Sequence, residues 1–280
     1  MNKCIECQKI FSITDKEHSF LKQLDLPDPE KCFQCRHRQR ISWRNERSLY
    51  NRTCQQCKKA IIACYSEESG VPIYCNSCWW SPTFDAYAYG KYFDFKRPFF
   101  EQFAELEKSI PHFALFKDPA SENCEYTNYG IANKSCYMAL CFASENICYG
   151  HGVIQSKDCL DVTKVQQCEL CYECLDCTSC NRLLYSQNCF KCNDSAFLMN
   201  CRNSTDCFGS INLNQKQYVW MNEQLTKEEY QQRTENFWDG YAIVKRFAGK
   251  SAHMEVGVAY GLGNRRKRRV WDGGGVFEGE

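Results

Sequence analysis

Four Cys-x2-Cys pairs lie within the first eighty residues of the chain. Taken in chain order they form two sets of four thiolates: Cys4, Cys7, Cys32 and Cys35, then Cys54, Cys57, Cys75 and Cys78. Two residues between cysteines allow a tight knuckle to aim both sulfurs at one ion, and a second knuckle completes the tetrahedron that zinc accepts. Because four thiolates leave no position for water, we predict two structural Zn²⁺ ions. The alternatives are an interleaved pairing of the sets, or eight buried cysteines without metal.

A second group of closely spaced cysteines runs as Cys168, Cys171, Cys174, Cys177 and Cys180. Runs of Cys-x2-Cys hold iron–sulfur clusters in ferredoxins, so an iron–sulfur cluster or a further zinc ion is a candidate for this run. The run lacks the ferredoxin ending, in which a last cysteine three residues on is followed by proline. We therefore keep a redox protein with a cluster here as an alternative hypothesis only.

Positive charge concentrates between the cysteine pairs. Residues 31–59 contain nine Lys or Arg and one acid, Glu46, although the whole chain has a net charge of only +1. Aromatic residues interleave with the arginines, as stacking and phosphate contact with single-stranded RNA or DNA require. The candidate nucleic-acid-binding residues are Arg36, Arg38, Arg40, Trp43, Arg44 and Arg47. The alternatives are a helix from Arg36 to about Tyr50 with core aromatics and solvated arginines, or an acidic protein partner.

No catalytic motif emerges. The five histidines are scattered, and neither HExxH, a Walker loop nor G-x-S-x-G occurs. We expect no enzyme. A second binding hypothesis is a protein-interaction scaffold, for which an exposed apolar patch around Trp79, Trp80, Phe84 and Tyr87 would be the mark.

The second half of the chain repeats with a period of twelve residues. Spacings of twelve separate Cys124, Cys136 and Cys148, then Cys168, Cys180 and Cys192, then Cys177, Cys189 and Cys201. Polar positions follow the same period in Asp176, Asn188, Asn200 and Asn212. Such a period predicts a short parallel β-solenoid with stacked cysteines or aromatics inside and hydrogen-bonded asparagine ladders. Whether a coil takes one or two such units stays open, and a phase slip between Cys148 and Cys168 suggests an inserted loop.

These features predict a mixed, mainly β chain built from two tandem zinc ribbons, a solenoid and two helices. A capping box at Thr226-Lys227-Glu228-Glu229 opens the second helix, which we expect to pack on the solenoid. The tail carries Arg265-Arg266-Lys267-Arg268-Arg269 and is expected to be disordered. The predicted divisions are 1–50 (first zinc ribbon), 51–96 (second zinc ribbon), 97–122 (helical linker), 123–220 (Cys/Asn-rich solenoid), 221–248 (C-terminal helix) and 249–280 (Gly/Arg-rich tail).

The start of the chain predicts where in the cell the protein is located. No run of 18 apolar residues occurs, and Cys4 stands where the apolar stretch of a signal peptide would lie. We expect a cytoplasmic protein with no membrane segment. The 23 cysteines could form a secreted disulfide scaffold, but their odd number and their spacing favour reduced thiols and metal.

The residues around the first pairs resemble those of a bacterial zinc-ribbon family. The motifs are Cys4-Ile5-Glu6-Cys7 and Cys32-Phe33-Gln34-Cys35-Arg36, with Phe11, Phe20, Pro27 and Pro29 between them. This pattern is similar to the domain type called "probable zinc-ribbon". With Trp43-Arg44-Asn45-Glu46-Arg47, Tyr74-Cys75-Asn76-Ser77-Cys78-Trp79-Trp80 and the cysteine-rich second half, the resemblance extends over about residues 1–235. It implies zinc and a bacterial cytoplasmic protein, and it implies no activity.

Overall fold

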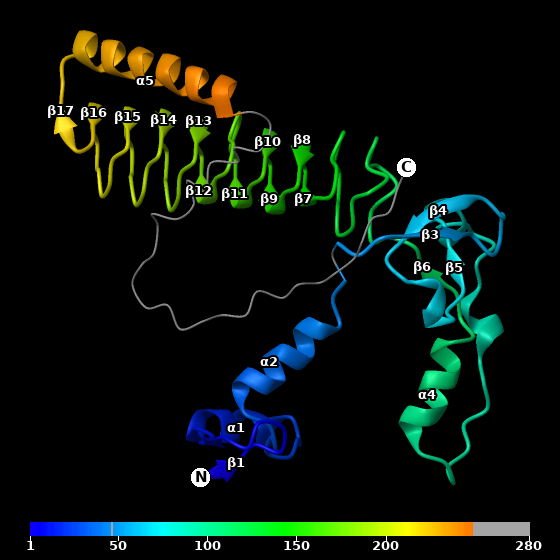
Figure 1. Cartoon of the computed structure of the whole chain (residues 1–280). Helices are drawn as coiled ribbons and strands as arrows, with labels where there is room; N and C mark the ends of the chain where they lie inside the picture. The colour runs from blue at the N-terminus through cyan, green and yellow to red at the C-terminus, as the bar shows by residue number, and fades with distance from the viewer. Residues whose placement is uncertain (46, 249–280) are drawn as a thin grey trace. The chain divides into compact units, whose positions relative to one another are not determined.

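The structure is a computed structural model that describes residues 1–45 and 47–248. The chain divides into two compact units, Met1–Arg47 and Ser48–Glu280, and each is described by itself. Most regular elements are strands, as expected for a mainly β chain (Figure 1). The predicted tail, residues 249–280 with its basic run, lies outside the described residues.

The first unit consists of a short hairpin and two helices. Thr14 caps the first helix, because its side-chain oxygen accepts the backbone N–H of Glu17 at 3.2 Å. That helix buries none of its residues, and the second buries only Cys35. The core of this unit is therefore little more than its cysteines with Phe11 against them. The elements are β1 (Asn2–Lys3), β2 (Ile10–Phe11), α1 (Asp15–Gln23) and α2 (Phe33–Ser42).

Helix α2 is shorter than the helix expected from Arg36 to about Tyr50. It ends at Ser42, where the backbone N–H of Trp43 bonds to the carbonyl oxygen of Arg40 and that of Arg44 to the carbonyl oxygen of Ile41. Tyr50 instead begins the first strand of the second unit. The aromatic side chains of this segment therefore do not share one helix.

The second unit begins with a cysteine-bearing hairpin. Two further strands of this unit, β5 and β6, pair in parallel, Ile73 with His112. The chain therefore returns to the hairpin region after α4. The linker expected at 97–122 contains one helix, α4, whose aromatic side chains are not buried, since Phe99 is 55% and Phe103 is 52% exposed. The elements are β3 (Tyr50–Thr53), β4 (Ala60–Ala63), η1 (Glu67–Ser69), β5 (Ile73–Tyr74), α3 (Asn76–Trp79), η2 (Ala86–Tyr89), α4 (Phe99–Glu107) and β6 (His112–Phe113).

The rest of the unit is a solenoid of stacked short parallel strands (Figure 1). From Cys141 onward each parallel pair joins residues twelve apart, as Thr163 with Leu175 and Asn193 with Thr205. One coil therefore takes twelve residues. The elements are β7 (Leu140–Phe142), β8 (Glu145–Cys148), β9 (His151–Ile154), β10 (Lys157–Leu160), β11 (Thr163–Gln166), β12 (Leu175–Thr178), β13 (Asn181–Leu184), β14 (Asn193–Ala196), β15 (Thr205–Phe208), β16 (Gln217–Trp220), β17 (Glu223–Gln224) and α5 (Lys227–Ala248).

Each coil is built from four sides of three residues. Every third residue from Cys141 to Ser210 is buried, and we call these the inward positions. Every third residue from Asn146 to Met221 has a positive φ, and we call these the corner positions. We call the remaining residues the outward positions. In the ladder between coils an outward N–H bonds to an inward carbonyl, as Lys157 to Cys168 at 2.9 Å, and a corner N–H to an outward carbonyl, as Leu170 to Lys157 at 3.2 Å.

This geometry corrects the expected asparagine ladders. Asp176, Asn188, Asn200 and Asn212 all occupy corner positions, with φ between 52° and 59°. Asparagine and aspartate tolerate the left-handed conformation better than most residues, because their short side chains hydrogen-bond locally. Backbone conformation therefore explains the polar series, and no stack of buried amides is needed.

The phase slip also lies elsewhere than expected. Strands β9, β10 and β11 pass through residues 148–168 without an inserted loop, so that prediction is wrong. The slip occurs at Ala139 and Cys141, two buried residues only two positions apart, where the ladder shifts register. Pairs that span it are eleven residues apart, as Tyr137 and Cys148 are, whereas Glu122 and Lys134 before it are twelve apart. Consequently Ile147, and not Cys148, occupies the inward position of its coil.

Helix α5 covers one side of the solenoid, as expected (Figure 1). Its capping box is confirmed: the Thr226 side chain accepts the N–H of Glu229 at 3.2 Å, and the Glu229 carboxylate accepts the N–H of Thr226 at 2.9 Å. The ring of Phe237 packs on Phe208, with centroids 4.7 Å apart. The helix therefore supplies a cover for the aromatic residues on that side.

Candidate metal centres

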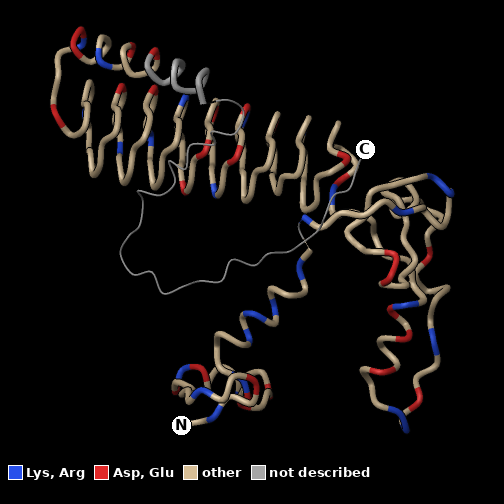
Figure 2. Tube along the Cα trace, in the orientation of Figure 1, with Lys and Arg blue, Asp and Glu red and all other residues tan. Residues whose placement is uncertain are grey.

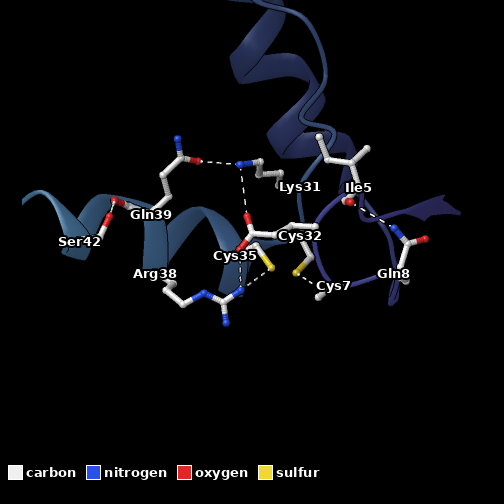
Figure 3. Close-up of polar contacts among 10 residues, drawn as sticks. Ile5, Cys7, Gln8, Lys31, Cys32, Cys35, Arg38, Gln39 and Ser42 are labelled. Atoms are coloured by element: carbon white, nitrogen blue, oxygen red, sulfur yellow. Dashed lines mark hydrogen bonds and ion pairs between the residues drawn. The ribbon is translucent and has the colours of Figure 1, made fainter. Parts of the chain in front are cut away.

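The first set of four cysteines converges on one point. Cys4 and Cys7 lie in the turn between β1 and β2, whereas Cys32 caps α2 and Cys35 lies in its first turn. All four sulfurs lie within 4.8 Å of one another. Those of Cys7 and Cys32, which Figure 3 shows beside Cys35, are 3.7 Å apart. A tetrahedron with zinc–sulfur bonds of about 2.3 Å has sulfurs about 3.8 Å apart. The donor set therefore fits a four-coordinate ion of this kind.

The second set repeats the arrangement. Cys54 and Cys57 lie in the turn between β3 and β4, and Cys75 and Cys78 lie at the start of α3. These four sulfurs also lie within 4.8 Å of one another, with Cys57 and Cys75 at 3.7 Å. The two sets expected from chain order are thus the sets that the fold brings together.

Each hairpin turn is closed by a residue in the left-handed conformation. Gln8 and Lys58 directly follow the second cysteine of their pairs, and each has a φ of 62°. Their N–H groups bond back to the carbonyls of Cys4 and Cys54, at 3.0 and 2.9 Å. The second pair of each set begins a helix, where two-knuckle ribbons would place another turn. Each candidate centre therefore combines one knuckle with one helix start.

The protonation of the four thiols differs within each centre. A hydrogen bond from the N–H of Cys7 lowers the pKa of the Cys4 thiol to about 6. Burial, together with the neighbouring sulfurs, raises the pKa of Cys35 to about 12. Since four thiolates repel one another, the protein alone does not ionise them all at neutral pH, whereas a bound divalent cation favours the thiolates.

Arg38 is the cation closest to the first centre. Its guanidinium donates to the sulfur of Cys35 at 3.4 Å and to the carboxylate of Glu6 at 2.6 Å (Figure 3). Lys31 also contacts Glu6, at 3.2 Å. Chain order could not identify these contacts, because Glu6 and Arg38 are brought together only by the convergence of the two cysteine pairs.

The candidate nucleic-acid-binding residues divide into two groups. Arg36 is half-buried and paired with Glu17 at 2.6 Å, and Arg38, although its side chain is 63% exposed, is paired with Glu6 at 2.6 Å. Arg40, Trp43, Arg44 and Arg47 are exposed, Trp43 to 80%. The structure therefore does not bring all six into one equivalent surface, because two of the arginines hold the first unit together.

The later cysteine run does not form a comparable centre. Cys168, Cys171, Cys174, Cys177 and Cys180 occupy successive inward positions of the solenoid, and each is buried. Outside the two four-cysteine sets, no three His, Cys, Asp or Glu side chains within residues 1–45 and 47–248 bring ligand atoms within 4.8 Å of one another. The structure thus places the run along the core instead of around one ion.

The expected apolar docking patch is likewise divided. Trp79 and Phe84 pack against each other, with centroids 4.9 Å apart, next to Tyr74. Trp80 and Tyr87 are exposed, at 57% and 94%. Two of the four aromatics therefore belong to the core of the second candidate centre.

Comparison with known proteins leaves the family open. The chain matches no protein-family model and no curated protein. The resemblance to bacterial zinc-ribbon proteins therefore stays a prediction. No helix among the described residues is both long enough and apolar enough to span a membrane.

Proposed function

We propose that the protein is a non-catalytic zinc-binding module of the bacterial cytoplasm that binds RNA or DNA through α2. The two four-cysteine centres support metal binding, and zinc suits a closed set of four thiolates. Zinc bound there would supply folding energy to a unit with almost no apolar core. The module would then present α2 as a stable helix.

The exposed face of α2 carries the proposal. Phe33, His37 and Arg40 follow one another at spacings of four and three, so they lie along one side of α2. Phe33 is 65% exposed, and its ring stacks on that of His37 with centroids 6.0 Å apart. Exposed rings beside arginines provide both base stacking and phosphate contact. Figure 2 shows how basic residues recur along this helix.

Binding to labelled single-stranded RNA and DNA tests the proposal. We expect Arg40→Ala and Trp43→Ala to weaken binding, each by about 1–3 kcal/mol for a stacking or charged contact, without loss of folding since both side chains are exposed. Arg40→Ala should also reduce the slope of log affinity against log salt by about 1. Lys22→Ala is the matched control, an exposed lysine on α1 of the same unit. Equal affinities for all three variants and the parent would contradict the proposal.

A second candidate function is a protein-interaction scaffold. Exposed aromatic rings gather between η2 and α4, where Tyr87, Tyr92, Phe95 and Phe100 are each at least 80% exposed. Phe93 and Phe95 contact edge to face at 4.9 Å, so the segment presents a cluster of rings. Cross-linking from position 92 or 95 would test this function, since a scaffold requires a specific partner there and the nucleic-acid proposal does not.

A further inference from the structure

The solenoid contains a column of thiols that neither candidate centre uses. In the coil of residues 168–179 all four inward positions are cysteines, and each is at most 2% exposed. The coils on either side continue the column in register, because inward residues twelve apart stack. The column consists of Cys159, Cys168, Cys171, Cys174, Cys177, Cys180, Cys189 and Cys192.

The thiols of this column lie beside one another, and each also donates to a backbone carbonyl, as Cys168 does to Gln166 at 3.3 Å and Cys171 to Glu169 at 3.4 Å. Hydrogen bonds with Cys159, Cys168 and Cys174 raise the pKa of Cys171, and the same contacts lower the pKa of Cys168 and Cys174. Contacts also run along the solenoid axis, from Cys168 to Cys180. The sulfurs therefore form a connected chain both around one coil and between coils.

Backbone hydrogen bonding alone does not require cysteine at these positions. Ser156 accepts the N–H of Cys168 at 3.1 Å and donates to the carbonyl of Ile154 at 2.9 Å. Ser186 and Ser195 make the same pair of bonds in later coils. Serine, valine and leucine thus fill inward positions elsewhere in the solenoid. The gathering of thiols in one coil therefore provides a set of soft ligands that the other coils lack.

We propose that this thiol column binds Cu(I). Soft thiolates select Cu(I), which is satisfied by two or three of them and allows each sulfur to bridge two ions. Neighbouring buried sulfurs at successive inward positions suit such an ion, whereas zinc requires four sulfurs around one point. When each Cu⁺ replaces one thiol proton, the bridged product carries no net charge, as a dry interior demands. Copper enters as Cu(I) and the protons leave to water, so no electron is transferred.

Anaerobic titration of the full-length, zinc-loaded protein with Cu(I) against a chromophoric Cu(I) chelator tests the proposal. We expect copper to bind with full retention of zinc, together with the ultraviolet thiolate-to-copper band and the emission of Cu(I) shielded from water. The variant Cys168→Ser/Cys171→Ser/Cys174→Ser/Cys177→Ser should lose the emission and most of the copper. Cys124→Ser/Cys136→Ser is the matched control within the same solenoid and should retain both.

The four single serine variants keep the test decisive if the quadruple variant does not fold. In Cys168→Ser, the hydroxyl would lie in line with Ser144 and Ser156, the inward residues on the same side of the two preceding coils. The backbone N–H of residue 180 would therefore keep an acceptor. Each single variant should bind less copper than the parent. Unchanged copper and emission in the singles, or copper that binds only by displacing zinc, would overturn the proposal. Neither result bears on nucleic-acid binding through α2.

Discussion

The hydroxyl oxygen of Ser156 accepts the backbone N–H of Cys168, one full coil further along the chain, at 3.1 Å. The same relation joins Ser195 to Cys207 at 3.0 Å. The N–H of an inward residue points into the interior, where the outward ladder offers it no carbonyl. Side chains of the preceding coil therefore complete the backbone hydrogen bonding of the next, which explains why small polar side chains recur at inward positions.

Replacing this acceptor should destabilise the solenoid. In Ser156→Ala the N–H of Cys168 stays buried without a partner, which costs about 1–3 kcal/mol. Ser156→Cys is the matched control. One coil further along the same side of the solenoid, the thiol of Cys168 accepts the N–H of Cys180, so a thiol can replace the hydroxyl as the acceptor. Denaturant unfolding monitored by circular dichroism measures the difference. Equal loss in both variants would show that volume, and not hydrogen bonding, governs this position.

Metal removal should unfold the first unit while the solenoid stays folded. Helix α1 buries no residue, and the core cluster consists of Cys4, Cys32 and Cys35 with Cys7 and Phe11. Structural zinc contributes about 10–16 kcal/mol of apparent binding free energy, which this small core cannot replace. After chelation, hydrogen exchange followed by mass spectrometry should show full exchange in residues 1–45 and continued protection in residues 144–210. Protection of α2 in the metal-free protein would contradict this dependence.

The periodic parts of the fold could be predicted from the sequence because each is a local repeat. A spacing of two residues between cysteines predicted the two convergent centres, and the period of twelve predicted the coils. The three-residue period was also present in the run from Cys168 to Cys180, but it could equally indicate metal ligands. The structure distinguishes the two, because residues that cannot be thiolate ligands, such as Ser186 and Leu198, occupy the same buried positions, and a left-handed residue separates each from the next. The period of three therefore belongs to the core of the solenoid and not to a set of metal ligands.

Features that depend on convergence could not be predicted in this way. The register shift at Ala139 and Cys141 removes a single residue from one coil, and Cys148 keeps its misleading distance of twelve from Cys136. The pairing of Arg38 with Glu6 joins residues 32 positions apart, so chain order placed that arginine on the binding surface. Tertiary contacts therefore decide which of the basic residues are already paired with a carboxylate of the protein.

Acidification should loosen the start of α5. Hydrogen bonds from the N–H and hydroxyl of Thr226 lower the pKa of Glu229. A carboxyl whose pKa is lowered on folding adds stability above its unfolded pKa of about 4.3, and this stability is lost as pH falls through the folded pKa. Exchange of the amides in the first turn of α5 should therefore accelerate, relative to the intrinsic rate, at pH values below about 4.

Glu229→Gln provides the control for this titration. Glutamine keeps an oxygen acceptor for Thr226 and does not titrate, so the variant should show no acid-dependent change in the first turn of α5. At neutral pH it should protect this turn less well than the parent, since the charged acceptor is lost. An identical acid response in parent and variant would assign the effect to other groups.

The docking of α5 should depend on Phe208. This side chain is 5% exposed, and its ring stacks on Trp220 at 4.2 Å and contacts Phe237 at 4.7 Å. Phe208→Ala would leave a cavity beneath the helix and should cost about 3–5 kcal/mol. Near-ultraviolet circular dichroism of the tryptophans, followed during thermal unfolding, should show α5 and its aromatic neighbours separating before the coils melt.

Phe190→Ala is the matched control for Phe208→Ala. Phe190 also occupies an outward position, but it is 41% exposed and does not belong to the aromatic cluster under α5. Its truncation should change the free energy of unfolding by no more than about 0.5–1 kcal/mol. Comparable losses in the two variants would mean that outward phenylalanines stabilise the coils themselves. A loss confined to Phe208→Ala would instead locate the stabilisation in the cover that α5 provides.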